Sequence, residues 1–222
     1  MRVAGIDAAP GRWALVVLES GRFAGAYAAA DLADLFARIP DVAAAAIDIP
    51  LSLPDSGVRG ADIAARRELG IRASTLFVVP PAPAFRAATQ AEATAIARSL
   101  GAPGVSAQVW ALRKRIFEAL PYAADERLVE AHPELSFARM AGAPLRAPKR
   151  TWNGLARRLQ LLNSQGIAFP DEIDGPGGAL PPADLVDAAA VAWSAHRYAR
   201  GLAERYPAAG ANGASRLGAI WA

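Results

Sequence analysis

The chain has 222 residues, of which 53% are hydrophobic, with a formal net charge of +3 and no cysteine. This composition predicts one α/β domain with a sizeable core and excludes disulfides and cysteine-based zinc sites. Because the first residues lack the apolar stretch of a signal peptide and no apolar run approaches ~18 residues, we expect a cytoplasmic protein without a membrane partner.

The first third of the chain predicts four strands and one helix. Apolar runs separated by turn residues predict strands at residues 2–7, 13–19 and 23–27, with a hairpin turn at residues 20–22. A helix at residues 31–38 and a fourth strand at residues 42–49 follow. This order is the opening of a ribonuclease-H-like fold, in which the fourth strand pairs in parallel with the first.

The rest of the chain predicts mostly helices. They are expected at residues 60–69, 90–100, 106–120, 133–140, 151–165 and 184–206, with a fifth strand at residues 127–131 and loops at 171–182 and 207–218. Residues 219–222 can form a last strand. The resulting prediction is a single α/β domain, residues 1–222. It has a ribonuclease-H-like mixed five-stranded sheet flanked by helices, with a helical insertion at about residues 55–125.

Two aspartates lie at the ends of predicted buried strands. Asp7 follows Gly5-Ile6, and Asp48 follows Ile47. A carboxylate in such a place is costly unless something compensates its charge. Because neighbouring strands run about 4.8 Å apart, the two carboxylates would repel each other, and a divalent cation would turn that repulsion into binding. The alternative is that each aspartate only forms a local turn before a nearby proline.

Two further aspartates, Asp184 and Asp187, begin the long alanine-rich helix near the end of the chain. Their spacing of three residues puts them on one helix face. Asp184 has a local alternative role as a helix-start residue that favours the helix dipole, so Asp187 is the stronger candidate ligand. Together with Asp7 and Asp48, they predict a site for Mg²⁺ or Mn²⁺, because these ions bind oxygen ligands.

The segment around the fifth strand adds a carboxylate and a histidine. Glu130 is a candidate catalytic residue at the strand end, and His132 is a candidate for proton transfer or phosphate contact. The alternative for His132 is a strand-to-helix turn with Pro133.

Several basic residues are candidates for contacts with nucleic-acid phosphates. Arg66, Lys149 and Arg150, together with His132, are the side chains that we select. Lys149 and Arg150 precede a predicted helix, where a positive charge opposes the helix dipole and therefore favours an anionic partner. The alternative is a solvated helix face with no ligand.

Short motifs spread along the chain resemble the domain-of-unknown-function family 429. They are Gly5-Ile6-Asp7-Ala8 with Gly11-Arg12-Trp13, Ile47-Asp48-Ile49-Pro50-Leu51, Arg59 with Asp62 and Arg66, Leu69-Gly70 with Ser74 and Phe77, Ser106 with Gln108 and Trp110, residues 130–137, Lys149 with Gly154 and Arg158, and Asp184 with Asp187-Ala188. The resemblance covers nearly the whole chain and implies a ribonuclease-H-like fold with a nuclease function. The last of these motifs is also similar to the final helix of Holliday-junction resolvases.

The leading functional expectation is a metal-dependent nuclease that hydrolyses phosphodiester bonds by a two-metal mechanism. Asp7, Asp48 and Asp187 would hold two Mg²⁺ or Mn²⁺ ions, with Asp184 or Glu130 assisting, and nucleic acid would be the partner. The alternative is a non-catalytic ribonuclease-H-like binding or scaffold protein. An ATP-handling enzyme of the sugar-kinase and actin type is a further alternative, but it needs a second domain and a second glycine-rich loop that this sequence lacks.

Overall fold

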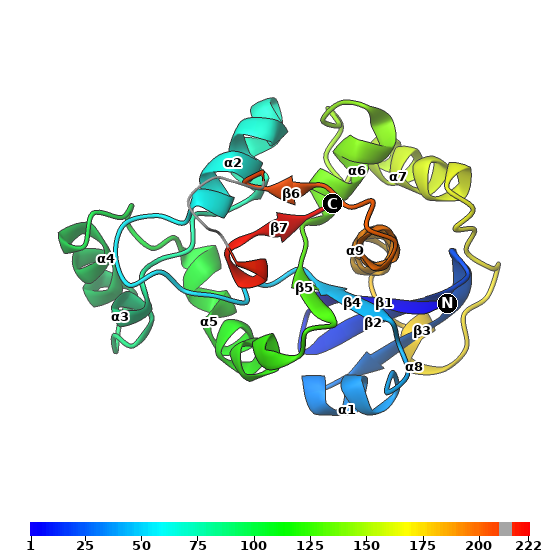
Figure 1. Ribbon diagram of the computed structural model, residues 1–222, viewed down its shortest axis with the longest axis horizontal. Helices are drawn as coiled ribbons and strands as arrows, with labels where there is room; N and C mark the ends of the chain where they lie inside the picture. Colours follow the sequence, from blue (N-terminus) through cyan, green and yellow to red (C-terminus); the bar gives the residue numbers. More distant parts are fainter. Residues whose placement is uncertain (209–214) are drawn as a thin grey trace.

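A computed structural model describes residues 1–208 and 215–222 of the chain. Its centre is a five-stranded sheet with long α9 on one face and α1 on the other (Figure 1). The sheet strands are β1 (Arg2–Ala9), β2 (Arg12–Glu19), β3 (Arg22–Ala29), β4 (Ala44–Ile47) and β5 (Leu128–Glu130), and α1 spans Leu32–Ala37. Both faces of the sheet are therefore buried, which explains the apolar runs in β1, β2 and β4.

The strand order is β3-β2-β1-β4-β5. The β1–β2 and β2–β3 pairs are antiparallel, whereas β4 pairs in parallel with both β1 and β5. The predicted mixed five-stranded sheet of ribonuclease-H-like layout is thus confirmed, including the parallel pairing of the first and fourth strands. Because Ile6 pairs with Ile47, the next residues, Asp7 and Asp48, lie side by side at one edge of the sheet.

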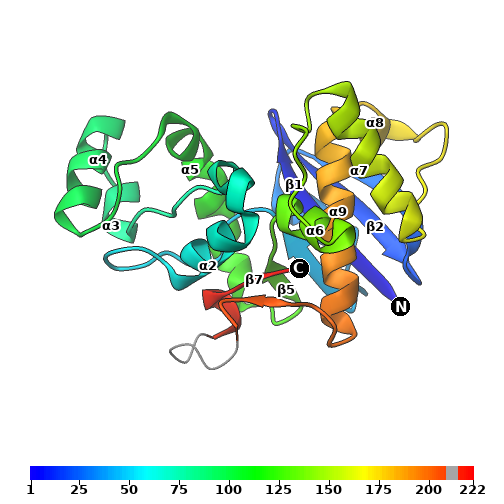
Figure 2. The same ribbon diagram turned by 90° about the horizontal axis from the view of Figure 1, so that it is seen from above.

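The chain between β4 and β5 is helical where it has regular structure. It contains α2 (Gly60–Leu69), η1 (Gly70–Thr75), α3 (Ala82–Phe85), α4 (Gln90–Ser99), α5 (Ala107–Ala119) and η2 (Leu120–Ala124). Figure 2 shows that α3, α4 and α5 form a group beside the sheet instead of covering a face of it. This group supplies a second wall next to the strand ends.

The α-helices after β5 are α6 (Pro133–Ala141), α7 (Trp152–Ser164), the short α8 (Gly175–Gly178) and α9 (Pro182–Ala199). Of these helices, α9 and α8 pack on the sheet, and α6 and α7 pack on α9. Helix α9 packs tightly on β1: a Cβ atom on Gly5 would lie 2.1 Å from the carbonyl oxygen of Ala188. Only glycine fits at position 5, and this contact places the start of α9 next to Asp7.

The last part of the chain differs from the prediction. The helix expected at residues 184–206 ends at Ala199, because Gly201 adopts a positive φ of 67° and residues beyond it leave the helix. Arg205–Tyr206 instead form β6, which pairs with β7 (Ile220–Trp221), so the predicted last strand is confirmed.

Two predicted loops also need correction. The loop at residues 171–182 contains α8, and the predicted loop at residues 207–218 ends in η3 (Arg216–Gly218). Residues 209–214 of that second loop lie outside the described residues. Across the described parts of the chain, every helix is too short or too polar to cross a membrane.

Candidate active site

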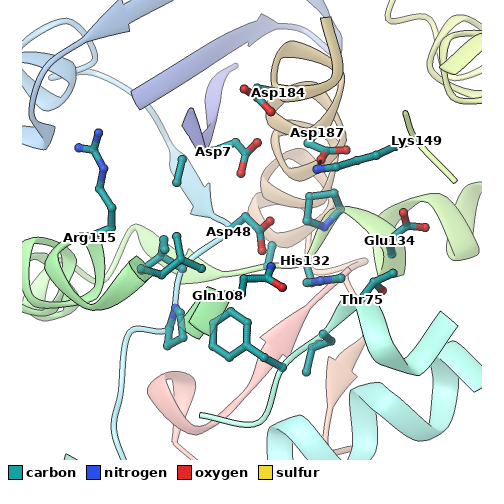
Figure 3. Close-up of a pocket in the computed structure, with 18 of the residues that line it drawn as sticks. Asp7, Asp48, Thr75, Gln108, Arg115, His132, Glu134, Lys149, Asp184 and Asp187 are labelled. Carbon is teal, nitrogen blue, oxygen red and sulfur yellow. Dashed lines mark hydrogen bonds and ion pairs between the residues drawn. The ribbon is translucent and has the colours of Figure 1, made fainter. Parts of the chain in front are cut away.

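A cleft of about 730 Å³ opens where β1 and β4 end, and we call it the acidic cleft. Four aspartates line it: Asp7, Asp48, Asp184 and Asp187. Figure 3 shows the carboxylates of Asp7, Asp48 and Asp187 around one shared space. Asp184 lies on α9, the helix that also carries Asp187. The structure therefore brings together the four aspartates that the sequence selected from three distant segments.

The sheet and α9 hold these aspartates in place. The backbone N–H of Asp48 donates to the carbonyl oxygen of Ile6 at 2.9 Å, which continues the parallel ladder to the residue beside Asp7. Asp187 precedes Ala188, whose backbone packs against Gly5. Among the described residues, neither Asp7 nor Asp48 accepts a hydrogen bond through its side chain, so the structure does not support the turn-forming alternative.

The aspartates of the acidic cleft are hard to ionise together. Burial raises the pKa of Asp7 well above its ordinary value, and the charges of Asp48 and Asp187 raise it further. Burial also raises the pKa of Asp48 to about 7 and that of Asp187 to about 6, although the charge of Lys149 opposes both shifts. These carboxylates have too few partners for their charge, which is the electrostatic condition of a cation site.

Lys149 is the cation that contacts this group. Its Nζ forms an ion pair with Oδ2 of Asp187. Burial lowers the pKa of Lys149, but the charges of Asp187, Asp7 and Asp48 outweigh burial and raise the pKa overall. Lys149 was predicted to bind nucleic-acid phosphate, whereas the structure places it on a carboxylate.

The segment before α7 fixes the position of Lys149. Thr151 caps α7 by accepting from the backbone N–H of Gly154 at 3.1 Å. A Cβ atom on Gly154 would lie 1.9 Å from the carbonyl oxygen of Pro148, so the chain folds tightly onto the first turn of the helix. The backbone at Lys149 is held between these two contacts.

Glu130 lines the acidic cleft, but its carboxylate is bound by neighbouring parts of the fold. Both of its carboxylate oxygens accept from the guanidinium of Arg59 at 2.8 Å, and Oε2 also accepts from the backbone N–H of Leu51 at 2.9 Å. These bonds leave no oxygen of Glu130 without a partner. The arrangement favours a role in holding β5 to the segment after β4, in place of the catalytic role predicted from the sequence.

The other predicted phosphate contacts lie in different places. Arg66 donates to the carbonyl oxygens of Ala73 and Leu76, and it is not among the described residues that line the acidic cleft. It therefore stabilises η1, which corrects the prediction for this residue.

Arg150 is exposed and His132 half-buried, and both line the cleft. Burial lowers the pKa of His132, which favours the neutral imidazole, and its buried Nδ1 has no hydrogen-bond partner.

Glu134 is a cleft residue that the sequence analysis did not select. Its Oε1 accepts from the fully buried Arg158 at 2.6 Å, while its Oε2 is buried without a partner. In the sequence, Glu134 looks like an ordinary first-turn residue after Pro133. Its buried arginine partner lies 24 positions later, which no local pattern shows.

The donor atoms of the acidic cleft fit a hard divalent cation, although the site is not pre-assembled. Within the described residues, no group of three or more Asp, Glu or His side chains is already arranged to hold a metal ion. The four aspartates offer carboxylate oxygens, which Mg²⁺ and Mn²⁺ prefer. One of them, Oδ1 of Asp187, is buried and has no partner. A cation in the cleft would supply that partner.

Strand order and cleft together define an α/β protein of ribonuclease-H-like layout with crowded carboxylates at the ends of its central strands. The chain belongs to the family described as "Protein of unknown function (DUF429)", whose model matches residues 5–211. No curated protein and no solved structure matches the chain. The family description names no reaction, so the activity has to be argued from the acidic cleft.

Proposed function

We propose that the protein is a metal-dependent nuclease that hydrolyses phosphodiester bonds of nucleic acid. The observation that carries this proposal is that Asp7 of β1, Asp48 just after β4 and Asp187 of α9 all line one cleft. Catalytic sites are places where burial and like charges shift pKa values, and this group shows both effects. The same three residues would hold Mg²⁺ or Mn²⁺, with Asp184 close by on α9.

The bound cation would neutralise the carboxylates and stabilise the negative charge that develops on a phosphate during hydrolysis. The protein's own residues would do the rest. Arg150, which is exposed and lines the cleft, would contact the phosphates of a nucleic-acid strand. His132, held neutral by burial, would be available to accept a proton.

The proposal is tested by incubating the protein with single-stranded, duplex and branched DNA and RNA in the presence of Mg²⁺ or Mn²⁺. We expect cleavage that requires the metal and that is abolished in Asp7→Asn, because asparagine keeps the shape but removes a full charge from the cation site. The matched control is Asp55→Asn, which changes an exposed aspartate outside the cleft and should cleave like the wild type. Equal cleavage by the wild type and Asp7→Asn would contradict the proposal.

One observation favours a second candidate, a non-catalytic protein that binds nucleic acid or another partner. Lys149 already neutralises part of the charge on Asp187, as a permanent internal counter-ion would do. Under this candidate the wild type takes up no divalent cation and cleaves none of the nucleic acids. Calorimetric titration with Mn²⁺ separates the two candidates without depending on the choice of nucleic acid.

A further inference from the structure

We infer that the acidic cleft takes one divalent cation instead of two, because the ammonium group of Lys149 supplies the second positive charge. This inference rests on the proposed function, since it concerns the metal site of that function. The sequence alone led to an expectation of two ions. The position of Lys149 lowers the expected number of ions from two to one.

The contacts place Lys149 inside the carboxylate group. Its Nζ pairs with Oδ2 of Asp187, and the same ammonium is stabilised by the charges of Asp7 and Asp48. About a third of the Lys149 side chain is exposed, whereas that of Asp187 is only 2% exposed. A cation that reaches the site from solvent therefore meets an Asp187 whose Oδ2 is taken and whose buried Oδ1 is free.

The charges in the cleft balance with one divalent cation. Asp7, Asp48 and Asp187 carry three negative charges when ionised, Lys149 offsets one, and one divalent ion offsets the remaining two. Of the neighbouring acidic groups, Glu134 accepts from Arg158, and the charges of Lys149 and Arg150 both act on Asp184. A second divalent ion would leave an excess of positive charge in a partly buried site, which is unfavourable.

The backbone around Lys149 keeps the ammonium in this place. The tight contact between Gly154 and Pro148 and the Thr151 cap fix the segment that carries Lys149 against α7. Lysine, with a compact charge on a flexible stem, can adjust to a neighbouring ion without leaving the cleft. Lys149 is thus a positioning residue for the cation and not a ligand of it.

The inference is tested by titrating Mn²⁺ into each protein and counting bound ions by calorimetry and by electron paramagnetic resonance of free Mn²⁺. We expect one ion in the wild type, one in Lys149→Arg, which keeps the charge, and two in Lys149→Met, which removes it. The matched control is Lys114→Met: Lys114 is the only other lysine, it is exposed on α5, and its loss should leave one ion bound.

Two ions in the wild type, one ion in Lys149→Met, or an ion that binds only after Lys149 is removed would each overturn the inference. If Lys149→Met does not fold, as judged by circular dichroism, Lys149→Gln takes its place. The numbers of ions bound by the wild type and by Lys149→Gln then test the inference. Two ions in a wild type whose cleavage depends on Asp7 would leave the nuclease proposal standing. No ion in any of the proteins would remove the nuclease proposal as well.

Discussion

Two groups of buried carboxylates lie close to each other, and they are paired very differently. In the first, Arg59 binds both Asp62 and Glu130, and the second oxygen of Asp62 accepts from the backbone N–H of Val79 at 2.8 Å. In the second, the acidic cleft, the single ammonium of Lys149 faces Asp7, Asp48 and Asp187. The first group is complete, whereas the second has room for another cation.

The comparison shows that burial of an acidic residue does not by itself indicate a binding site. A buried carboxylate whose oxygens all have partners serves the fold, and removing one partner leaves an uncompensated charge. A buried carboxylate with a raised pKa and an oxygen without a hydrogen-bond partner, such as Asp187, is suited to bind a cation. Glu130 and Asp187 differ in this respect although both come from apolar segments of similar appearance.

The largest effect should come from breaking the complete group. Arg59→Met leaves Asp62 and Glu130 buried without their shared cation, and we expect the free energy of unfolding to fall by about 3–5 kcal/mol. Urea denaturation of the metal-free protein at pH 7.5 measures this change. The matched control is Arg127→Met, which removes an arginine that is 45% exposed and paired with Asp125, and its loss should be much smaller.

A variant Arg59→Met as stable as the wild type would contradict the comparison. It would mean that the two groups are equivalent in energy and that Glu130 can also serve as an open ligand. Glu130 would then fit the catalytic role that the sequence predicts for it.

A smaller effect of opposite sign is expected from the acidic cleft. The pKa of Asp48 is about 7 in the folded protein, against an ordinary value of 3.8, so the folded state binds more protons between these values. The stability of the metal-free wild type therefore decreases as the pH rises through this window. Asp48→Asn removes the effect and should be more stable than the wild type at pH 8, by on the order of 1 kcal/mol. The gain should disappear near pH 4.

Asp125→Asn is the control for this pH dependence. The hydrogen bond from Arg127 lowers the pKa of Asp125, so Asp125 stabilises the fold at high pH and loses that contribution as the pH falls through its folded pKa. Asp125→Asn should therefore be slightly less stable than the wild type at pH 8, opposite to Asp48→Asn. Thermal unfolding in EDTA at pH 4, 6 and 8 compares the three proteins. Destabilisation by Asp48→Asn at pH 8 would contradict the account of carboxylate repulsion.

The fold and the aspartates of the cleft were predictable from the sequence for one physical reason. Short-range patterns mark strands, and the carboxyl ends of two parallel neighbours meet at one edge of a sheet. Asp7 and Asp48 therefore had to be close once the first and fourth strands paired. Asp187 followed from its place one turn into a helix with small residues that pack closely on β1.

The ion partners were not predictable, because each depends on contacts between distant segments. Arg59 reaches Glu130 across 71 positions, and Lys149 reaches Asp187 across 38. Neither the residue types nor their spacing in the chain shows which carboxylate a given arginine or lysine will neutralise. As a result, the sequence did not show that Lys149 pairs with a carboxylate or that Arg66 donates to backbone carbonyls, and Glu134 was missed.

The most direct test of the central claim is a crystal structure of the protein soaked in Mn²⁺, with anomalous difference density used to locate the ion. We predict one peak in contact with carboxylate oxygens of Asp7, Asp48 and Asp187, with Lys149 still beside Asp187. The peak should be absent from crystals of Asp7→Asn soaked in the same way. A wild-type crystal with no peak in the acidic cleft, or with Mn²⁺ bound at Glu130 and Asp62 instead, would contradict the claim that the underpaired carboxylates form the cation site.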